Sequence, residues 1–214
     1  MLAACGGRAE VQQPIATSAS FAQSAPSATS AVGRGTVSPG SEDYALVLTA
    51  PAIQPRPATS GDQTLTMPGP GAIPQTLDPA LIRDAGGSFI ARQIFRGLVR
   101  LDDDMSVIPE IAERIEVSSD GRTYTFDLRT NAEFHDGSPI DATAVKRSFE
   151  RASDPELGDG DGFSLSAAIY LIDIEGVEAR LAGEADEISG IEVVSSTSVV
   201  MRLTRPIANF LYKL

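Results

Sequence analysis

The chain has 214 residues, a net charge of −12 and a pI near 4.5, with one histidine, one cysteine and no tryptophan. The single cysteine excludes an internal disulfide and a metal site built from cysteines. Most of the acidity lies in residues 63–214, which hold 14 basic against 25 acidic side chains, and an acidic domain repels nucleic acid. No stretch of about 18 apolar residues occurs, so the sequence predicts no membrane-spanning helix.

Residues 8–62 form a long low-complexity segment, with 13 Ser or Thr, 6 Pro and many Ala. A segment of this composition buries too little apolar surface to offset the entropy of its chain. The apolar run at 44–48 could form a strand, but prolines follow it closely. We therefore predict that the whole of 8–62 is a disordered, flexible tether.

The next part of the chain carries short alternating and helical patterns. QTLTM at 63–67 alternates polar and apolar residues, which predicts a strand. TLDP at 76–79 predicts a turn, because the residue before a proline avoids the helical conformation. Apolar residues spaced by three and four predict a helix over 86–98, and a strand over 98–101 follows. A short helical turn is expected at 109–114.

The clearest pattern is a hairpin followed by a helix. Apolar and polar residues alternate up to Leu128, and an Asp-Gly pair at 120–121 supplies a tight turn, so a hairpin is predicted over 115–128. A second Asp-Gly pair turns the chain at 136–137, and Asp141 can cap a helix. The apolar face of that helix consists of Ala144, Val145, Ser148, Phe149 and Ala152.

Beyond this helix the sequence predicts a polar loop at 154–162 and helical segments at 164–172 and 174–182. Alternation then predicts a second hairpin over 190–203, and another helix begins at 208.

Three polar groups are candidates for chemical sites. The Asp run at 102–104 and the DGDG sequence at 159–162 lack the glutamate that completes a calcium loop, so both are predicted to be turns. His135 stands beside Asp136, but adjacent residues in a tight turn rarely aim at one point, and a turn-stabilising role is favoured. Acid–base pairs among 102–113 keep a hydrolase open as an alternative. We predict no metal, no cofactor and no catalytic residue.

The sequence resembles the solute-binding receptors of peptide/nickel-type ABC importers, the family-5 extracytoplasmic binding proteins. The resemblance centres on TYTFDLRTNAEFHDGSPIDATAVKRSFERASDP, and flanking pieces follow in the same order and spacing: TLDPA, RQIFRGLVRLDDD, PEIAERIEVSSDG, IEGVEARLAGEAD and ISGIEVVSSTSVVMRLTRPIANFL. It covers residues 63–214. The resemblance implies a mixed α/β fold of the periplasmic-binding-protein type II class, of which these residues are the amino-terminal part, comprising the first lobe and part of the subdomain.

The family also implies a function and a set of ligand residues. Its members close two lobes on a solute, typically a short peptide, and deliver it to a membrane permease driven by ATPase subunits. The loop after TLDP lines the ligand cleft in the family, which points to Arg83, Asp84 and Ala85. An aromatic residue near Phe163 packs on the ligand in peptide-binding members. The structural alternatives are a surface loop with a charge pair and a core aromatic.

The first residues suggest a membrane anchor. Leu2-Ala3-Ala4-Cys5 resembles a bacterial lipoprotein signal-peptidase box, so 1–7 would be the remnant of a signal and Cys5 the lipidated residue. The alternative is an unpaired cysteine. This motif implies an extracytoplasmic protein, periplasmic or on the outer face of the cytoplasmic membrane. A ligand sensor that uses the same fold without transport remains the alternative function.

Overall fold

The computed structural model describes residues 36–38, 44–50, 74–157 and 165–214. All of them belong to one compact unit, Val32–Leu214. It contains runs of strands and runs of helices, and the fold is mixed α/β. Within these described ranges, every helix is too short or too polar to cross a membrane.

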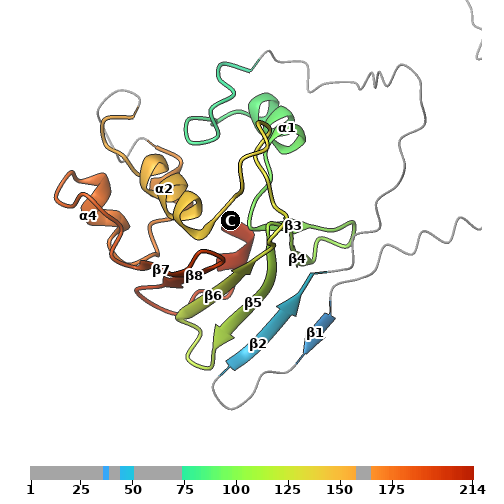
Figure 1. Ribbon diagram of the computed structural model, residues 1–214. Helices are drawn as coiled ribbons and strands as arrows, with labels where there is room; N and C mark the ends of the chain where they lie inside the picture. Colours follow the sequence, from blue (N-terminus) through green and yellow to red (C-terminus); the bar gives the residue numbers. More distant parts are fainter. Residues whose placement is uncertain (1–35, 39–43, 51–73, 158–164) are drawn as a thin grey trace, which may run out of the picture. The chain divides into compact units, whose positions relative to one another are not determined.

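A six-stranded antiparallel sheet in the order β1-β2-β5-β6-β8-β7 organises the unit (Figure 1). Its strands are β1 (Thr36–Ser38), β2 (Tyr44–Thr49), β5 (Ala112–Ser118), β6 (Thr123–Leu128), β7 (Ile191–Ser195) and β8 (Ser198–Arg202). A two-stranded ribbon is formed by β3 (Val99–Leu101) and β4 (Val107–Pro109).

The hairpin β5–β6 confirms the prediction for 115–128. Ile115 pairs with Phe126, and both side chains are fully buried, because alternate residues of the two strands face the core. Gly121 occupies the left-handed region at φ 69°, and Asp120 accepts a hydrogen bond from Arg122 N at 3.0 Å. The Asp-Gly pair therefore turns the chain as its chemistry predicts.

The core gathers on one face of the sheet. The rings of Tyr124 and Phe210 lie 4.8 Å apart between centroids, and Phe210, Val199 and Met201 are fully buried. Helix α2 (Ala142–Ala152) contacts β7 and β8. The predicted helix is confirmed: Asp141 Oδ1 accepts from Ala144 N at 2.7 Å and so caps its first turn.

Two predictions are wrong. Residues 109–114 do not form a helical turn, because Pro109 pairs with Val99 in the ribbon and the chain enters β5 at Ala112. The tether prediction fails at β1 and β2. Leu48 pairs with Ile115 and is only 6% exposed, so the apolar run finds a partner at the edge of β5. The edge of a sheet supplies hydrogen-bond partners for the backbone N–H and C=O groups of an added strand. The amino-acid composition of residues 44–49 does not reveal that such a partner exists.

The remaining elements are shorter than predicted. Helix α1 (Ala85–Ile94) ends before Phe95, whose backbone is extended. Two short helices, α3 (Ala167–Tyr170) and α4 (Val177–Leu181), stand where longer segments were expected. The hairpin β7–β8 is confirmed, and a 3₁₀ turn, η2 (Phe210–Lys213), replaces the last predicted helix. The predicted strand at 63–67 lies outside the described residues.

Candidate functional site

The loop at 76–84, which leads into α1, is folded by its own backbone. Leu81 N and Ile82 N both donate to the carbonyl oxygen of Asp78, at 3.0 and 3.1 Å. The Asp78 carboxylate accepts from Ala80 N at 3.1 Å, and Thr76 Oγ1 accepts from Asp78 N at 3.1 Å. This arrangement confirms the turn predicted from TLDP.

Two side chains hold the loop against the helices. Arg151 on α2 contacts both carboxylate oxygens of Asp78, with Nη1 at 3.1 Å from Oδ1. The hydrogen bond from Arg151 lowers the pKa of Asp78 below its ordinary 3.8. Ser166 Oγ, next to α3, donates to the carbonyl oxygen of Ile82 at 3.0 Å. The loop is thereby fixed to segments more than 70 residues away in the chain.

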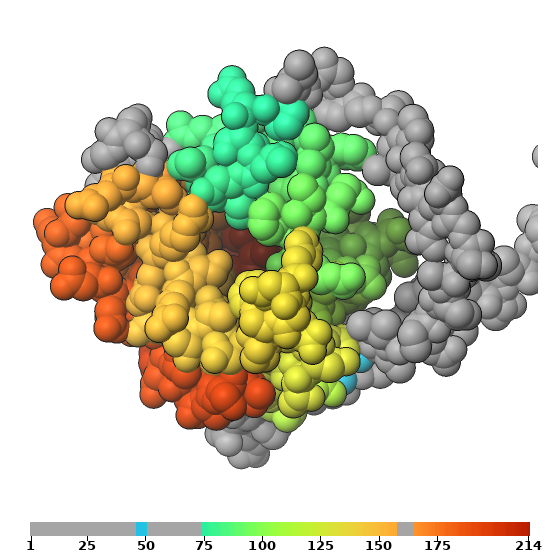
Figure 2. Space-filling view, turned by 45° about the horizontal axis from the view of Figure 1, so that its top comes forward, coloured from blue at the N-terminus to red at the C-terminus, as the bar shows by residue number. Residues whose placement is uncertain are grey.

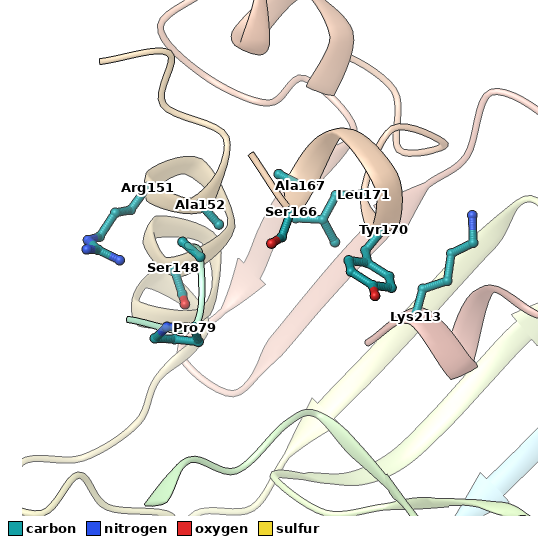
Figure 3. Close-up of a pocket in the computed structure, with 10 residues that line it drawn as sticks. Pro79, Ser148, Arg151, Ala152, Ser166, Ala167, Tyr170, Leu171 and Lys213 are labelled. Carbon is teal, nitrogen blue, oxygen red and sulfur yellow. The ribbon is translucent and has the colours of Figure 1, made fainter. Parts of the chain in front are cut away.

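A pocket of about 190 Å³ lies where these segments meet. Figure 2 shows the surface hollowed between the green segment that contains α1 and the orange helix α2, with dark red carboxyl-terminal residues at the floor. The pocket is lined by the loop, α2, α3 and η2, through Pro79, Ala80, Ser148, Arg151, Ala152, Ser166, Ala167, Tyr170, Leu171 and Lys213 (Figure 3). Small apolar side chains and three hydroxyl-bearing side chains line it, and Arg151 and Lys213 stand at its two ends (Figure 3).

An ion cluster fixes the η2 side of the pocket. Lys213 Nζ donates to Asp173 Oδ2 at 2.5 Å, and Arg205 Nη2 lies 3.4 Å from Asp173 Oδ1. Asp173 is buried, 6% exposed, and the hydrogen bond from Lys213 is the main cause that lowers its pKa below 3.8. The Lys213 side chain extends past the half-exposed Tyr170, at the opposite end of the pocket from Arg151 (Figure 3).

The ligand residues predicted from the family resemblance have mixed placements. Arg83 is exposed on the same loop, and Ala85 is the first residue of α1. Asp84 caps α1, because its Oδ1 accepts from Gly87 N at 2.7 Å. Among the described lining residues, the loop contributes Pro79 and Ala80 instead. Phe163 and Cys5 lie outside the described residues, so their predicted roles stay predictions.

Sequence reasoning missed most of the pocket. Arg151, Ser166, Tyr170 and Lys213 come from three elements, and nothing in their local sequence shows that they converge. Pro79 and Ala80 carried a signal, since they lie in the TLDPA motif.

Asp102–Asp104 and the His135–Asp136 pair lie in turns, and the DGDG sequence at 159–162 lies outside the described residues. Asp136 Oδ1 accepts from Ser138 N at 2.9 Å and from Ser138 Oγ at 2.6 Å, and not from its neighbour His135. Asp102 Oδ1 accepts from the backbone N–H groups of Asp104 and Ser106, at 3.0 and 2.9 Å. In the part of the chain that the structure describes, no three His, Cys, Asp or Glu side chains are grouped to hold a metal ion.

The fold is that of a solute-binding domain. The sequence model of the bacterial extracellular solute-binding proteins, family 5 Middle, matches residues 106–214, which is half of the chain. The chain therefore belongs to family 5 of these proteins, and the family predicted from the sequence is confirmed.

Curated proteins are similar to part of the chain. The chain is 44% identical over 81 residues to the glutathione-binding protein GsiB of Salmonella paratyphi A, which is 38% of this chain and 16% of that protein. It is 40% identical over 86 residues to GsiB of Pectobacterium atrosepticum, covering 40% of this chain and 17% of the relative.

Solved structures resemble the described fold. Haemophilus influenzae OppA in complex with RPPGFSPFR superposes with a TM-score of 0.60 at 27% identity, over 67% of this chain and 27% of that one. The Escherichia coli murein tripeptide binding protein MppA gives 0.57 at 29% identity, over 64% and 26%. These neighbours confirm the predicted fold class. The chain spans about a quarter of the length of these structures and less of the curated relatives.

Proposed function

We propose that the complete protein is the substrate-binding receptor of an ABC importer, which captures short peptides and passes them to a membrane permease with its ATPase subunits. The observation that carries this proposal is the family-5 match over 106–214. The names of the relatives support the ligand class, because they bind glutathione, a murein tripeptide or a peptide such as RPPGFSPFR.

The geometry around the loop at 76–84 supports a ligand role for this region. The loop is held on one side by Asp78–Arg151 and on the other by Ser166, so its backbone is presented in one conformation. A fixed backbone favours binding, because less conformational entropy is lost when a ligand is captured. In this proposal Arg83, Asp84, Ala85 and Phe163 contact the bound peptide.

We infer that the protein binds its ligand without chemical change. The family consists of solute-binding proteins. Several described carboxylates are engaged in turns, helix caps and ion pairs, such as Asp136 with Ser138, Asp141 with Ala144 N and Asp173 with Lys213. A carboxylate engaged in this way suits a structural role better than proton transfer.

The proposal includes a lipid anchor and an extracytoplasmic location. Cys5, in the sequence Leu2-Ala3-Ala4-Cys5, would carry the acyl chains. Two chains on one residue give stable membrane attachment. Intact-mass analysis of the membrane-extracted protein tests this part: a diacylglyceryl adduct on Cys5 supports it, and an unmodified cysteine in the wild-type protein contradicts it.

Calorimetric titration of the full-length protein with glutathione, trialanine and RPPGFSPFR tests the ligand class. Binding of at least one of them, with no new product in the mixture after incubation, supports a peptide receptor. A protein that binds none of the three contradicts the proposal, and cleavage of any of them favours a hydrolase. Uptake of the bound peptide by cells with and without the gene separates an importer from a ligand sensor, because only the importer loses uptake when the gene is deleted.

A further inference from the structure

The pocket beside α2 and α3 differs in charge from the chain around it. Residues 63–214 hold 25 acidic and 14 basic side chains. The described residues that line the pocket include Arg151 and Lys213 and no carboxylate, together with the hydroxyl groups of Ser148, Ser166 and Tyr170. The pocket therefore has two cationic lining residues and no anionic one, although it lies in an acidic protein, which favours an anion over a cation.

The positive charge at Lys213 is only partly neutralised. Asp173 accepts from Lys213 but also contacts Arg205, so one carboxylate serves two cations. The ammonium carries three donors, and Asp173 is the acceptor that it contacts among the described residues, so two N–H groups can serve a ligand. At the other end of the pocket the guanidinium of Arg151 is half-exposed and paired with Asp78.

The size of the pocket limits what it can receive. About 190 Å³ is several times the roughly 30 Å³ that one water molecule occupies in the liquid. This volume admits one side chain or one chain end of a peptide. Tyr170 lies beside Lys213 and offers an aromatic surface for the apolar part of such a group (Figure 3).

We propose that this pocket is a subsite for a carboxylate of the bound peptide, with Lys213 as the residue that receives it. The carboxylate belongs either to an acidic side chain or to the peptide's carboxyl terminus. The inference rests on the proposed receptor function and adds a preference for acidic over neutral groups at one position of the ligand. Asp173 is the positioning residue, since it holds the ammonium at the pocket.

Lys146 provides a matched control for Lys213. Its side chain is 21% exposed against 22% for Lys213, and its Nζ lies 2.6 Å from Glu187 Oε2, against 2.5 Å for Lys213 and Asp173. Lys146 lies on α2 and is not among the residues that line the pocket. Lys146→Met therefore removes the same charge from an equally exposed lysine without altering the subsite, although the partner of Lys146 is exposed and that of Lys213 is buried.

The test is calorimetric titration of the full-length wild-type protein, Lys213→Met, Lys213→Arg and Lys146→Met with three probes. These are Ala-Glu-Ala, Ala-Gln-Ala and the carboxyl-terminal amide of Ala-Gln-Ala. Because a charge-assisted hydrogen bond forms only with a carboxylate, we expect the wild-type protein to bind the preferred carboxylate probe about tenfold more tightly than the matching neutral probe. Preference for Ala-Glu-Ala over Ala-Gln-Ala assigns the subsite to a side chain, and preference for the acid over the amide assigns it to the terminus.

The proposal requires that Lys213→Met abolish the wild-type preference and that Lys146→Met and Lys213→Arg keep it. Lys213→Arg retains the charge, and continued binding of the neutral probe by Lys213→Met shows that lost preference is not lost folding. Equal affinity of the wild-type protein for all three probes overturns the subsite but leaves the receptor function standing. If Lys146→Met and Lys213→Met lose the preference for the carboxylate probe to the same extent, the subsite is also overturned, because the loss would then follow from the net charge of the protein. Binding of no probe by the wild-type protein overturns the receptor function and the subsite together.

Discussion

Arg151 and Asp78 join two segments that lie 73 residues apart in the chain. Nη1 and Nη2 of Arg151 donate to Oδ1 and Oδ2 of Asp78. In this bidentate arrangement Arg recognises a carboxylate with directional specificity. The pair fixes the loop at 76–84 to α2 and brings Pro79 and Ala80 to the pocket. It is therefore a positioning contact for one wall of the site.

Replacing Arg151 with Met should loosen this loop more than it lowers global stability. The side chains of Arg151 and Asp78 are 55% and 24% exposed, so solvent screening limits the loss in unfolding free energy to about 0.5–1 kcal/mol. Amide hydrogen exchange at Leu81 and Ile82 should become faster. Arg147→Met, at an exposed position of the same helix, is the control and should leave that exchange unchanged. Equal exchange in both variants would show that the ion pair does not hold the loop.

Acid should weaken the Asp173 cluster in a defined range of pH. Lys213 lowers the pKa of Asp173 in the folded protein below its ordinary 3.8, so the folded state binds fewer protons than the unfolded state. The stabilisation is present above about pH 4 and is lost as the pH falls through the folded pKa. Asp173→Asn should lower the unfolding free energy by about 1–2 kcal/mol at pH 7 and by less below pH 4.

Denaturant unfolding from pH 3 to pH 7 measures this dependence. Glu187→Gln is the control, because the Glu187 side chain is 71% exposed and its pair with Lys146 is open to solvent. Its effect should be smaller at every pH. A deficit of Asp173→Asn that stays constant across the range would refute the link to the protonation of Asp173.

Two glycines with similar backbones should respond differently to alanine. Gly176 and Gly137 have φ of 85° and 83°, a conformation that costs an L-residue roughly 1–2 kcal/mol. A Cβ on Gly176 would lie 2.5 Å from Ser189 Oγ and 2.6 Å from Ser189 N, whereas nothing lies within 4 Å of one on Gly137. Gly176→Ala should therefore cost about 3 kcal/mol and Gly137→Ala about 1 kcal/mol of unfolding free energy. Thermal unfolding of both variants decides this, and equal costs would contradict the predicted clash.

A serine at position 84 distinguishes two roles of Asp84, as the cap of helix α1 and as a charged ligand contact. As the cap of α1 it accepts from Gly87 N, and serine caps nearly as well as aspartate, whereas alanine costs about 1 kcal/mol. Asp84→Ser should keep the stability that Asp84→Ala loses. If Asp84 also contacts ligand through its charge, as the family resemblance implies, Asp84→Ser should weaken peptide binding while stability is kept. Full affinity in Asp84→Ser would confine Asp84 to the cap.

The elements of the fold that depend on a few neighbouring residues could be predicted from the sequence. Asp120 and Gly121 fix a hairpin, Asp141 starts a helix, and alternation marks β6 and β8, because each of these features depends on a few neighbouring residues. The predictions of a helical turn at 109–114 and of a tether at 44–49 failed, because strands form there by pairing with other segments of the chain. Local sequence carries little information about such a partner.

In the candidate site, too, the features set by neighbouring residues could be predicted, and the contacts between distant residues could not. TLDP could be read as a turn from the sequence, and the family resemblance pointed to the loop that follows it. The sequence did not reveal that Asp78 would meet Arg151, or that Lys213 would reach the pocket through Asp173. These contacts depend on how α2, α3 and η2 pack, and packing depends on the whole core.

The pairing of β6 with β8 has a consequence for how the chain acquires its structure. Asp127 and Ser198 are hydrogen-bonded across these strands at a separation of 71 residues. A chain leaving the ribosome can close the β5–β6 hairpin early, but β8 joins only after α2, α3 and α4 have emerged. Pairings of this range fold slowly, and until they form the apolar face of Ile115 and Phe126 stays open to other chains. We expect newly made protein to depend on chaperones during that interval.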